Sequence, residues 1–181
     1  MRITGGKYRG RTIVCPPGVI RPAMDRMRES LFSILGDIED RSFLDLFSGS
    51  GTIALEAASR GARPVTAIEK DRGKRSIMEK NLAIAEEPVA LHFMPVERFL
   101  TRVHSAYDIV FMDPPFAYKF KTQLLQWAAE RRLLSVEGVL LIHHPTAEAL
   151  PETISGGASG SLKRFDLRLY GGSTVDFYSP E

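Results

Sequence analysis

The sequence is poor in cysteine and tryptophan and has no long apolar run, and these shortages exclude whole classes of protein. Its 181 residues include one cysteine and one tryptophan. Cys15 alone cannot build an intramolecular disulfide framework or a cysteine-rich zinc site. No apolar run approaches the roughly 18 residues of a membrane-spanning helix, and residues 1–7 lack the apolar stretch of a signal peptide. We expect one cytoplasmic, monomeric domain without a metal or a membrane partner.

Charge is small in total but uneven along the chain. The 24 basic and 22 acidic residues give a formal net charge of +2. Residues 1–30 hold seven basic and two acidic side chains, a net of +5, which leaves 17 basic and 20 acidic residues, a net of −3, for residues 31–181. Because Lys and Arg neutralise phosphate, this basic arm is a candidate nucleic-acid contact, although a solvated extension has the same composition. The candidates are Lys7, Arg9, Arg11, Arg21, Arg26 and Arg28.

Short apolar runs alternate with helical patterns from Ser42 onward. Continuous apolar runs separated by helices are typical of parallel strands that are buried on both faces. The expected strands are 43–47, 65–68, 89–94, 107–112 and 139–143, and the expected helices are 52–60, 72–85, 96–103 and 120–134.

Two further features frame this region. Upstream, Asp25 is expected to cap a helix over 26–35 that stops at Gly36. Downstream, residues 164–170 and 174–178 are expected to pair as a hairpin across Gly171-Gly172. The pattern therefore predicts an α/β domain with a small N-terminal appendage and an antiparallel C-terminal edge.

A glycine loop joins the first expected strand to the helix that follows it. Gly49 and Gly51 allow a tight turn and close approach of a ligand, and Glu69, 20 residues after Gly49, can accept hydrogen bonds from ribose hydroxyls. Asp45 precedes the loop, where its carboxylate can meet a cationic amino-acid group or order the loop itself. A pyrophosphate gains nothing from that negative charge. The loop therefore favours S-adenosylmethionine over a dinucleotide, which the glycine spacing also fits.

The segment Asp113-Pro114-Pro115-Phe116 ends the expected strand 107–112. Ligands bind outside the carboxyl ends of strands in open α/β sheets, so we expect this corner to face the glycine loop. Consecutive prolines make a stiff turn whose carbonyl oxygens remain acceptors. Asp113 and the Pro114 carbonyl can accept the hydrogens of an exocyclic amine while Phe116 stacks on its ring. A proline-rich turn with a packed phenylalanine is the structural alternative.

With these motifs, the sequence resembles the class I methyltransferases that carry an Asp-Pro-Pro-Phe/Tyr motif. It is most similar to the RsmD-type family of bacterial small-subunit (16S) ribosomal RNA guanine-N2 methyltransferases. The family's Gly-Lys-Tyr-Arg-Gly-Arg opening matches residues 6–11, and its Arg-Pro-x-x-Asp-Arg-x-Arg-Glu-x-Leu-Phe segment matches residues 21–32. The glycine loop, Glu69 and the corner at Asp113 follow in family order, so the resemblance covers nearly the whole chain.

The resemblance implies a Rossmann-like class I methyltransferase fold with a mostly parallel seven-stranded sheet and an antiparallel C-terminal edge strand. Residues 1–30 would form a basic appendage and helix start, and residues 31–181 the S-adenosylmethionine-dependent methyltransferase domain. The implied catalytic residues are Asp113, Pro114 and Phe116. The implied cofactor-binding residues are Asp45, Phe47, Gly49, Ser50, Gly51, Glu69, Lys70, Val96 and Asp113. Lys119 joins the nucleic-acid contacts of the arm, and Tyr118 and Lys121 are further candidates.

Two positions depart from the family pattern. The loop after the third strand has Pro95-Val96 where relatives commonly carry an acidic or amide residue that bonds the adenine amino group. Adenine recognition is then expected to rest on backbone and apolar contacts. The fifth strand ends in His143-His144, where relatives often have a glutamate, and we interpret these histidines as strand-end packing because no acidic or cysteine partners stand at metal-ligand spacing.

We therefore expect methylation of a guanine N2 in small-subunit ribosomal RNA, as free RNA or in an assembling subunit. A DNA adenine-N6 or another nucleic-acid amino methyltransferase is the nearest alternative, although the short chain leaves little room for a separate target-recognition domain. An NAD-dependent oxidoreductase leaves the Asp113–Phe116 corner unexplained. A noncatalytic RNA-binding domain leaves both the glycine loop and the corner unexplained.

Overall fold

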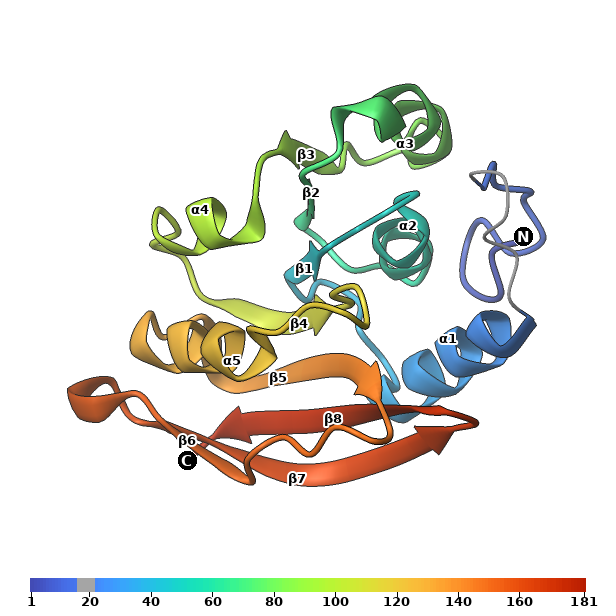
Figure 1. Cartoon of the computed structure of the whole chain (residues 1–181). Coiled ribbons are helices and arrows are strands. Elements are labelled where there is room, and N and C mark those ends of the chain that lie inside the picture. The colour runs from blue at the N-terminus through green and yellow to red at the C-terminus, as the bar shows by residue number, and fades with distance from the viewer. Residues whose placement is uncertain (16–21) are drawn as a thin grey trace. The chain divides into compact units, whose positions relative to one another are not determined.

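Strands alternate with helices from residue 22 to residue 145, as the sequence pattern predicts (Figure 1). The structure is a computed structural model that describes residues 1–15 and 22–181. The chain divides into two compact units, Met1–Met94 and Pro95–Glu181. The boundary expected at residue 30 falls inside the first helix, so the N-terminal appendage is part of the first unit. Assignment of residues 31–181 to a methyltransferase domain stays a prediction.

The sheet of the first unit is parallel throughout. Its strands are β1 (Phe43–Leu46), β2 (Val65–Glu69) and β3 (Ala90–Phe93), in the order β3-β2-β1. Phe43 pairs with Val65, and Thr66 pairs with Ala90. Every residue of β1 and β2 is buried, which is what a continuous apolar run in a parallel sheet requires. The C-terminal ends of both strands are therefore buried in the first unit.

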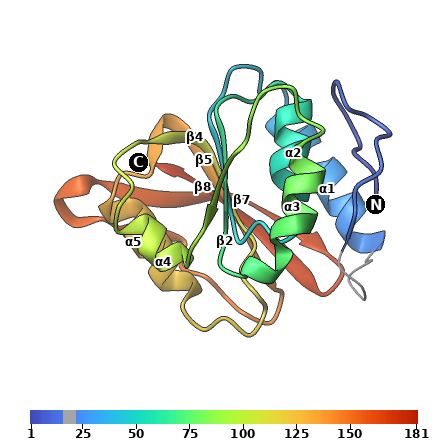
Figure 2. The same ribbon diagram turned by 90° about the horizontal axis from the view of Figure 1, so that it is seen from above.

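The helices of the first unit are α1 (Pro22–Leu35), α2 (Thr52–Ser59), the 3-10 turn η1 (Arg72–Lys74) and α3 (Arg75–Leu82). Figure 2 shows α2 and α3 side by side, with the N-terminal segment next to α1 and α2. The expected cap at Asp25 is wrong, because α1 begins at Pro22 and Asp25 lies in its first turn. Proline at the first helical position costs no hydrogen bond, so the helix can begin earlier than the apolar pattern indicates.

The C-terminus of α1 follows the prediction. Gly36 has a φ of 69°, and its N–H donates to the Phe32 carbonyl at 3.2 Å. This left-handed residue ends the helix in the way that glycine usually does. The Phe32 ring stacks on Phe43 of β1 with ring centroids 6.0 Å apart, which fixes α1 against the first unit's sheet.

The second unit holds two helices and a mixed sheet. Its elements are α4 (Val96–Leu100), β4 (Tyr107–Met112), α5 (Lys121–Glu130), β5 (Leu134–Pro145), β6 (Thr153–Ser155), the 3-10 turn η2 (Gly157–Ser159), β7 (Ser161–Tyr170) and β8 (Ser173–Pro180). The strand order is β4-β5-β8-β7-β6, with β4 and β5 parallel and the remaining pairs antiparallel. The expected hairpin across Gly171-Gly172 is confirmed as β7 and β8.

The expected fold class, α/β with parallel strands and antiparallel C-terminal strands, is confirmed. The described residues contain eight strands rather than seven. The additional one, β6, has three residues, too few for an apolar alternation to show in the sequence. In residues 1–15 and 22–181, no helix is both long enough and apolar enough to span a bilayer.

Candidate active site

The glycine loop between β1 and α2 adopts the left-handed backbone conformation that its glycines allow. Phe47, Gly49 and Gly51 have φ values of 64°, 61° and 78°. A Cβ on Gly51 would lie 3.2 Å from Leu82 of α3, so both conformation and space require glycine there. A Cβ on Gly49 would meet only the Phe47 carbonyl, at 4.0 Å. The backbone at Gly49 is therefore open to close approach by a ligand.

Asp45 orders this loop from within the first unit's core. Its carboxylate is 1% exposed, and Oδ2 accepts hydrogen bonds from Ser48 Oγ at 2.5 Å and from the Ala54 N–H at 3.1 Å. One bond reaches the start of the loop and the other reaches the first turn of α2. Of the two roles that the sequence left open for Asp45, the structure shows loop ordering.

Glu69 ends β2 against the same loop. Its Oε2 accepts the Gly49 N–H at 2.9 Å and lies 3.2 Å from Lys74 Nζ, while Oε1 accepts the Asp71 N–H at 2.9 Å. A carboxylate offers about four acceptor positions, and these bonds use three of them. Glu69 is thus fixed in place by the chain and retains acceptor capacity for a ribose hydroxyl.

Asn81 of α3 braces the loop from behind, and sequence reasoning missed it. The side chain is 1% exposed, and its Nδ2 donates to the Ser50 and Val14 carbonyls, both at 2.8 Å. Its Oδ1 accepts the Val14 N–H at 2.8 Å. A polar residue between Met78 and Leu82, at helical spacing on the buried face, was the available signal. One buried amide therefore ties the glycine loop to the N-terminal segment.

The remaining expected cofactor residues differ in their surroundings. Phe47 and Ser50 are half-buried on the loop, with Ser50 Oγ 2.7 Å from Thr52 Oγ1, and Lys70 is exposed. Val96, 3% exposed, begins α4 in the second unit, which also contains Asp113. The structure brings Asp45, Gly49 and Glu69 together; the expectation that the corner at Asp113 faces them stays a prediction.

The Asp-Pro-Pro-Phe segment turns away from β4 as a stiff corner. The Asp113 side chain is 26% exposed, Pro114 is buried, and Phe116 is 41% exposed. The Tyr118 N–H donates to the Pro115 carbonyl at 2.7 Å, which closes the turn. The corner thus presents a carboxylate and an aromatic face together, as binding of a planar ring with an amino group requires.

Lys121 holds this corner from inside, which makes its expected contact with nucleic acid wrong. It is 1% exposed, and its Nζ donates to the Phe116 and Tyr118 carbonyls at 3.0 and 2.6 Å and pairs with Glu148 at 2.8 Å. A buried ammonium needs such partners, and here they are the carbonyls of the turn. Of the three candidates after the corner, Lys119 is exposed.

Tyr118 turns inward as well. Its hydroxyl donates to Glu97 Oε1 at 2.5 Å, so Glu97 is engaged within the second unit. Burial raises the pKa of Tyr118, and the hydrogen bond to Glu97 raises it further. The phenol therefore stays protonated and acts as a hydrogen-bond donor to the helix that begins at Val96.

His143 of β5 meets Asp113, so its interpretation as strand-end packing missed a polar contact. Its Nδ1 lies 2.8 Å from Asp113 Oδ1, and its ring lies 5.3 Å from that of Phe116 between centroids. The pairing of Met112 with Ile142 brings the next residues of the two strands side by side. Sequence could have indicated this contact only once β4 and β5 were known to be neighbours.

The basic arm keeps most of its expected charges at the surface. Lys7, Arg9, Arg11 and Arg26 are exposed, and Lys7 pairs with Glu86. Arg21 lies outside the described residues. Arg28 is 2% exposed, with Nε 3.2 Å from Glu56 and Nη2 3.1 Å from Asp25, so its expected nucleic-acid contact is wrong. Its place on the buried face of α1, one residue after Met27, explains the difference.

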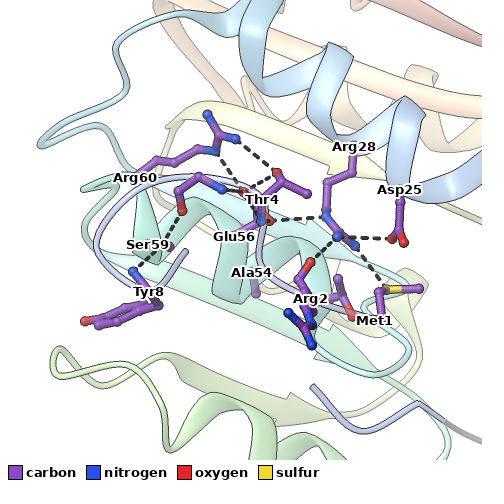
Figure 3. Close-up of polar contacts among 12 residues, drawn as sticks. Met1, Arg2, Thr4, Tyr8, Asp25, Arg28, Ala54, Glu56, Ser59 and Arg60 are labelled. Carbon is purple, nitrogen blue, oxygen red and sulfur yellow. Dashed lines mark hydrogen bonds and ion pairs between the residues drawn. The ribbon is translucent and has the colours of Figure 1, made fainter. Parts of the chain in front are cut away.

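Glu56 of α2 gathers the arm around one fully buried carboxylate (Figure 3). It accepts the Thr4 and Gly5 N–H groups, both at 2.9 Å, and the Thr4 hydroxyl at 2.7 Å. Arg60 Nε adds a bond at 3.0 Å. Ser59 extends this contact by accepting the Tyr8 N–H at 2.8 Å and donating to the Gly5 carbonyl at 2.6 Å. The arm is therefore bonded to α2 through its backbone, and its exposed cations are held on a fixed support.

Comparison with known proteins gives consistent results for sequence and fold. The family described as Conserved hypothetical protein 95 matches residues 1–179. Ribosomal RNA small subunit methyltransferase D of Escherichia coli strain K12 is 36% identical over 155 residues, which cover 83% of this chain and 78% of that protein. Among solved structures, yhhF from Escherichia coli has a TM-score of 0.85 at 30% identity and covers 100% of this chain and 98% of its own.

A more distant structure shares the fold alone. SMU.776, solved as a complex with SAH, has a TM-score of 0.70 at 20% identity. The match covers 88% of this chain and 50% of that one. The chain described above therefore resembles proteins of one family closely and resembles a wider group in its fold.

Proposed function

We propose that this chain, which belongs to the family of ribosomal RNA small subunit methyltransferase D, transfers a methyl group from S-adenosylmethionine to a guanine N2 in small-subunit ribosomal RNA. One observation carries the proposal: Asp113 and the exposed Phe116 stand on one stiff corner in a chain whose glycine loop is closed by Glu69. The corner is suited to binding an aromatic amine, and the glycine loop with Glu69 is suited to binding a nucleoside cofactor. The relative's name supports ribosomal RNA as the carrier of that amine.

The residues of the glycine loop fit S-adenosylmethionine. When bound, this cofactor supplies an electrophilic methyl group on a sulfonium. Glu69 would hold the ribose with its remaining acceptor capacity, and the open backbone at Gly49 would allow close approach. Asp45 and Asn81 would keep the loop in this conformation, because their bonds fix both of its ends and its middle. Adenine would rest on apolar and backbone contacts near Val96.

The corner would activate the amine by position. An aromatic amine is a poor nucleophile because its lone pair is delocalised into the ring. If the Asp113 carboxylate and the Pro114 carbonyl accept its two hydrogens, the nitrogen is held in the pyramidal form and its lone pair points away from both acceptors. Phe116 would stack on the base, and the Asp113 carboxylate is placed to accept the proton that the amine loses. No covalent enzyme intermediate is needed.

The guanine must leave its stack to reach such a corner, as in other enzymes that modify bases. Contacts to the RNA backbone would come from the exposed cations of the arm, Lys7, Arg9, Arg11 and Arg26, and from Lys119 after the corner. These side chains neutralise phosphates without reading sequence. Selection of the target guanine would then rest on the corner and on the fold of the RNA around it.

Replacement of Asp113 tests the proposal. We expect Asp113→Ala to lower methyl transfer to small-subunit ribosomal RNA by about 100-fold or more, because one of two acceptors for the amine is lost. Binding of S-adenosylmethionine should remain. The measurement is transfer of labelled methyl groups to free ribosomal RNA, to assembling small subunits and to duplex DNA. Asp166→Ala, which removes a carboxylate of β7, is the matched control and should retain activity. Label in DNA alone, or equal loss in the two variants, would contradict the proposal.

A further inference from the structure

The carboxylate of Asp113 is held by a buried histidine on the neighbouring strand. Met112 and Ile142 are paired in the parallel register of β4 and β5, so Asp113 and His143 follow at the same level of the sheet. His143 is 5% exposed, and its Nδ1 lies 2.8 Å from Asp113 Oδ1. The pairing of the two adjacent strands therefore places the two side chains next to each other.

The chemistry of the pair assigns the proton. An ionised carboxylate only accepts hydrogen bonds, so the His143 Nδ1–H is the donor to Asp113. The other ring nitrogen, Nε2, is buried and has no hydrogen-bond partner within residues 1–15 and 22–181. A proton on Nε2 instead would leave a buried donor unsatisfied and would also break the bond to Asp113. The tautomer with the proton on Nδ1 is the one that this site stabilises.

This bond determines how Asp113 can serve a substrate. Oδ1 accepts one hydrogen bond from His143, which restricts rotation of the carboxylate and leaves Oδ2 with its full acceptor capacity for an amine. The His143 ring also meets Phe116, with centroids 5.3 Å apart and planes at 66°. One side chain thus contacts both the hydrogen-bonding and the stacking residue of the corner.

His144, the next residue, is engaged elsewhere. Its Nε2 lies 3.2 Å from Oδ1 of Asp176 of β8, and Oδ2 of the same carboxylate accepts a hydrogen bond from Arg164 at 2.8 Å. Successive side chains of a strand point to opposite faces of the sheet, so the two histidines serve different groups. The contact with the corner belongs to His143.

We infer that His143 is a positioning residue for methyl transfer, which orients the Asp113 carboxylate toward the amino group of the target base. This role rests on the proposed function, because it acts through the acceptor that the proposal assigns to Asp113. A hydrogen bond to a charged group, when it acts in the transition state, changes rates by roughly 10- to 100-fold. We expect removal of the His143 donor to lower the rate of methyl transfer by an amount in that range.

Two substitutions separate this role from packing. His143→Phe keeps an aromatic ring against Phe116 but removes the donor. His143→Asn removes the ring but keeps an N–H donor on Cγ, where Nδ1 stands in histidine. Kinetics of both variants are measured with S-adenosylmethionine and small-subunit ribosomal RNA, alongside the melting temperature and the Kd for the cofactor. We expect kcat to fall roughly 10- to 100-fold in His143→Phe and only a few-fold in His143→Asn, with KM for RNA nearly unchanged in both.

The order of the two variants decides the inference. Faster turnover by His143→Asn than by His143→Phe, with cofactor binding retained, supports the positioning role. Turnover by His143→Phe that equals or exceeds that of His143→Asn would overturn it, while activity of the unaltered protein still supports the proposed function. Absence of transfer by the unaltered protein would contradict the proposed function itself, and the role of His143 would fall with it.

Discussion

At the scale of single residues, burial decides what a charge does. Arg28 belongs to the basic arm by composition, yet it is 2% exposed and pairs with Glu56, which is 0% exposed. Two opposite charges that are buried together cost desolvation, which is repaid only when both are fully bonded. Thr4, Gly5 and Arg60 supply the further bonds to Glu56. Arg28 is therefore a structural cation, and the charge offered to a partner is carried by other side chains of the arm.

Glu56→Gln tests this network through stability. The substitution keeps the shape of the side chain but removes the charge opposite Arg28, and breaking a buried pair typically costs about 3–5 kcal/mol. We expect a decrease of roughly 3 kcal/mol in the free energy of unfolding, measured by urea denaturation. Glu79→Gln removes an exposed partner of Arg75 and should cost less than about 1 kcal/mol. Equal effects of the two substitutions would show that the Glu56 network contributes no more than a surface pair.

Asp176 gives a pH-dependent prediction. Burial alone would raise its pKa, but the polar contacts with His144 and Arg164 outweigh burial and hold the pKa below its ordinary value. A carboxyl whose pKa is lower in the folded state stabilises the fold above its ordinary pKa, and this stability is lost as the pH falls through the folded pKa. We expect the stability difference between the unaltered protein and Asp176→Asn to shrink below about pH 4 in urea titrations. A difference that is constant from neutral pH to pH 2 would contradict this.

At the scale of elements, the N-terminal arm is both a support and a charged surface. Its backbone is bonded to Glu56 and Ser59 of α2, and Val14 is bonded to Asn81 of α3. Deletion of residues 1–11 would leave Glu56 without its arm partners, so loss of RNA binding in such a variant would not separate charge from folding. Neutral substitutions at the exposed positions leave the backbone bonds between the arm and α2 in place.

The triple variant Lys7→Gln, Arg9→Gln and Arg11→Gln tests the charged surface alone. Each lost phosphate contact should reduce the slope of log Kd against log salt by about 0.7–0.9, so loss of all three should reduce it by about 2.1–2.7. Affinity for small-subunit ribosomal RNA is measured over a salt series, and stability should change little. Lys80→Gln, Arg98→Gln and Arg102→Gln remove the same charge from exposed positions elsewhere. An unchanged slope for the arm variant, or an equal change for the control, would contradict a role of the arm in RNA binding.

Sequence patterns predict elements well where the determinants are local. The apolar run at 107–112 and the hairpin across Gly171-Gly172 are found as expected because strand burial and turn chemistry are encoded within each segment. The start of α1 was misplaced because proline at its first position is compatible with either helix or loop. Two contacts could not be predicted in this way: that of Asn81 with Ser50 and that of His143 with Asp113. Each joins two elements that are neighbours only in the folded chain, and no local sequence pattern indicates this.

At the scale of the whole molecule, the net charge of +2 is the sum of a basic N-terminal arm and a slightly acidic remainder. The cations of the arm are exposed, and the backbone that carries them is hydrogen-bonded to α2. Arg28 and Lys121, in contrast, are buried and paired within their own units. The first unit carries Asp45, Gly49 and Glu69, and the second carries the corner. The proposed function assigns a role to both sets of residues, so we expect activity only from the complete chain.

The identity of the methylated nucleoside tests this account most directly. The protein is incubated with S-adenosylmethionine and small-subunit ribosomal RNA that lacks the modification, both free and in assembling subunits, and the RNA is digested to nucleosides for mass spectrometry. We expect N2-methylguanosine, formed by the unaltered protein and almost absent with Asp113→Ala. Methylation of adenosine, of a different guanine position or of no nucleoside in either substrate would contradict it.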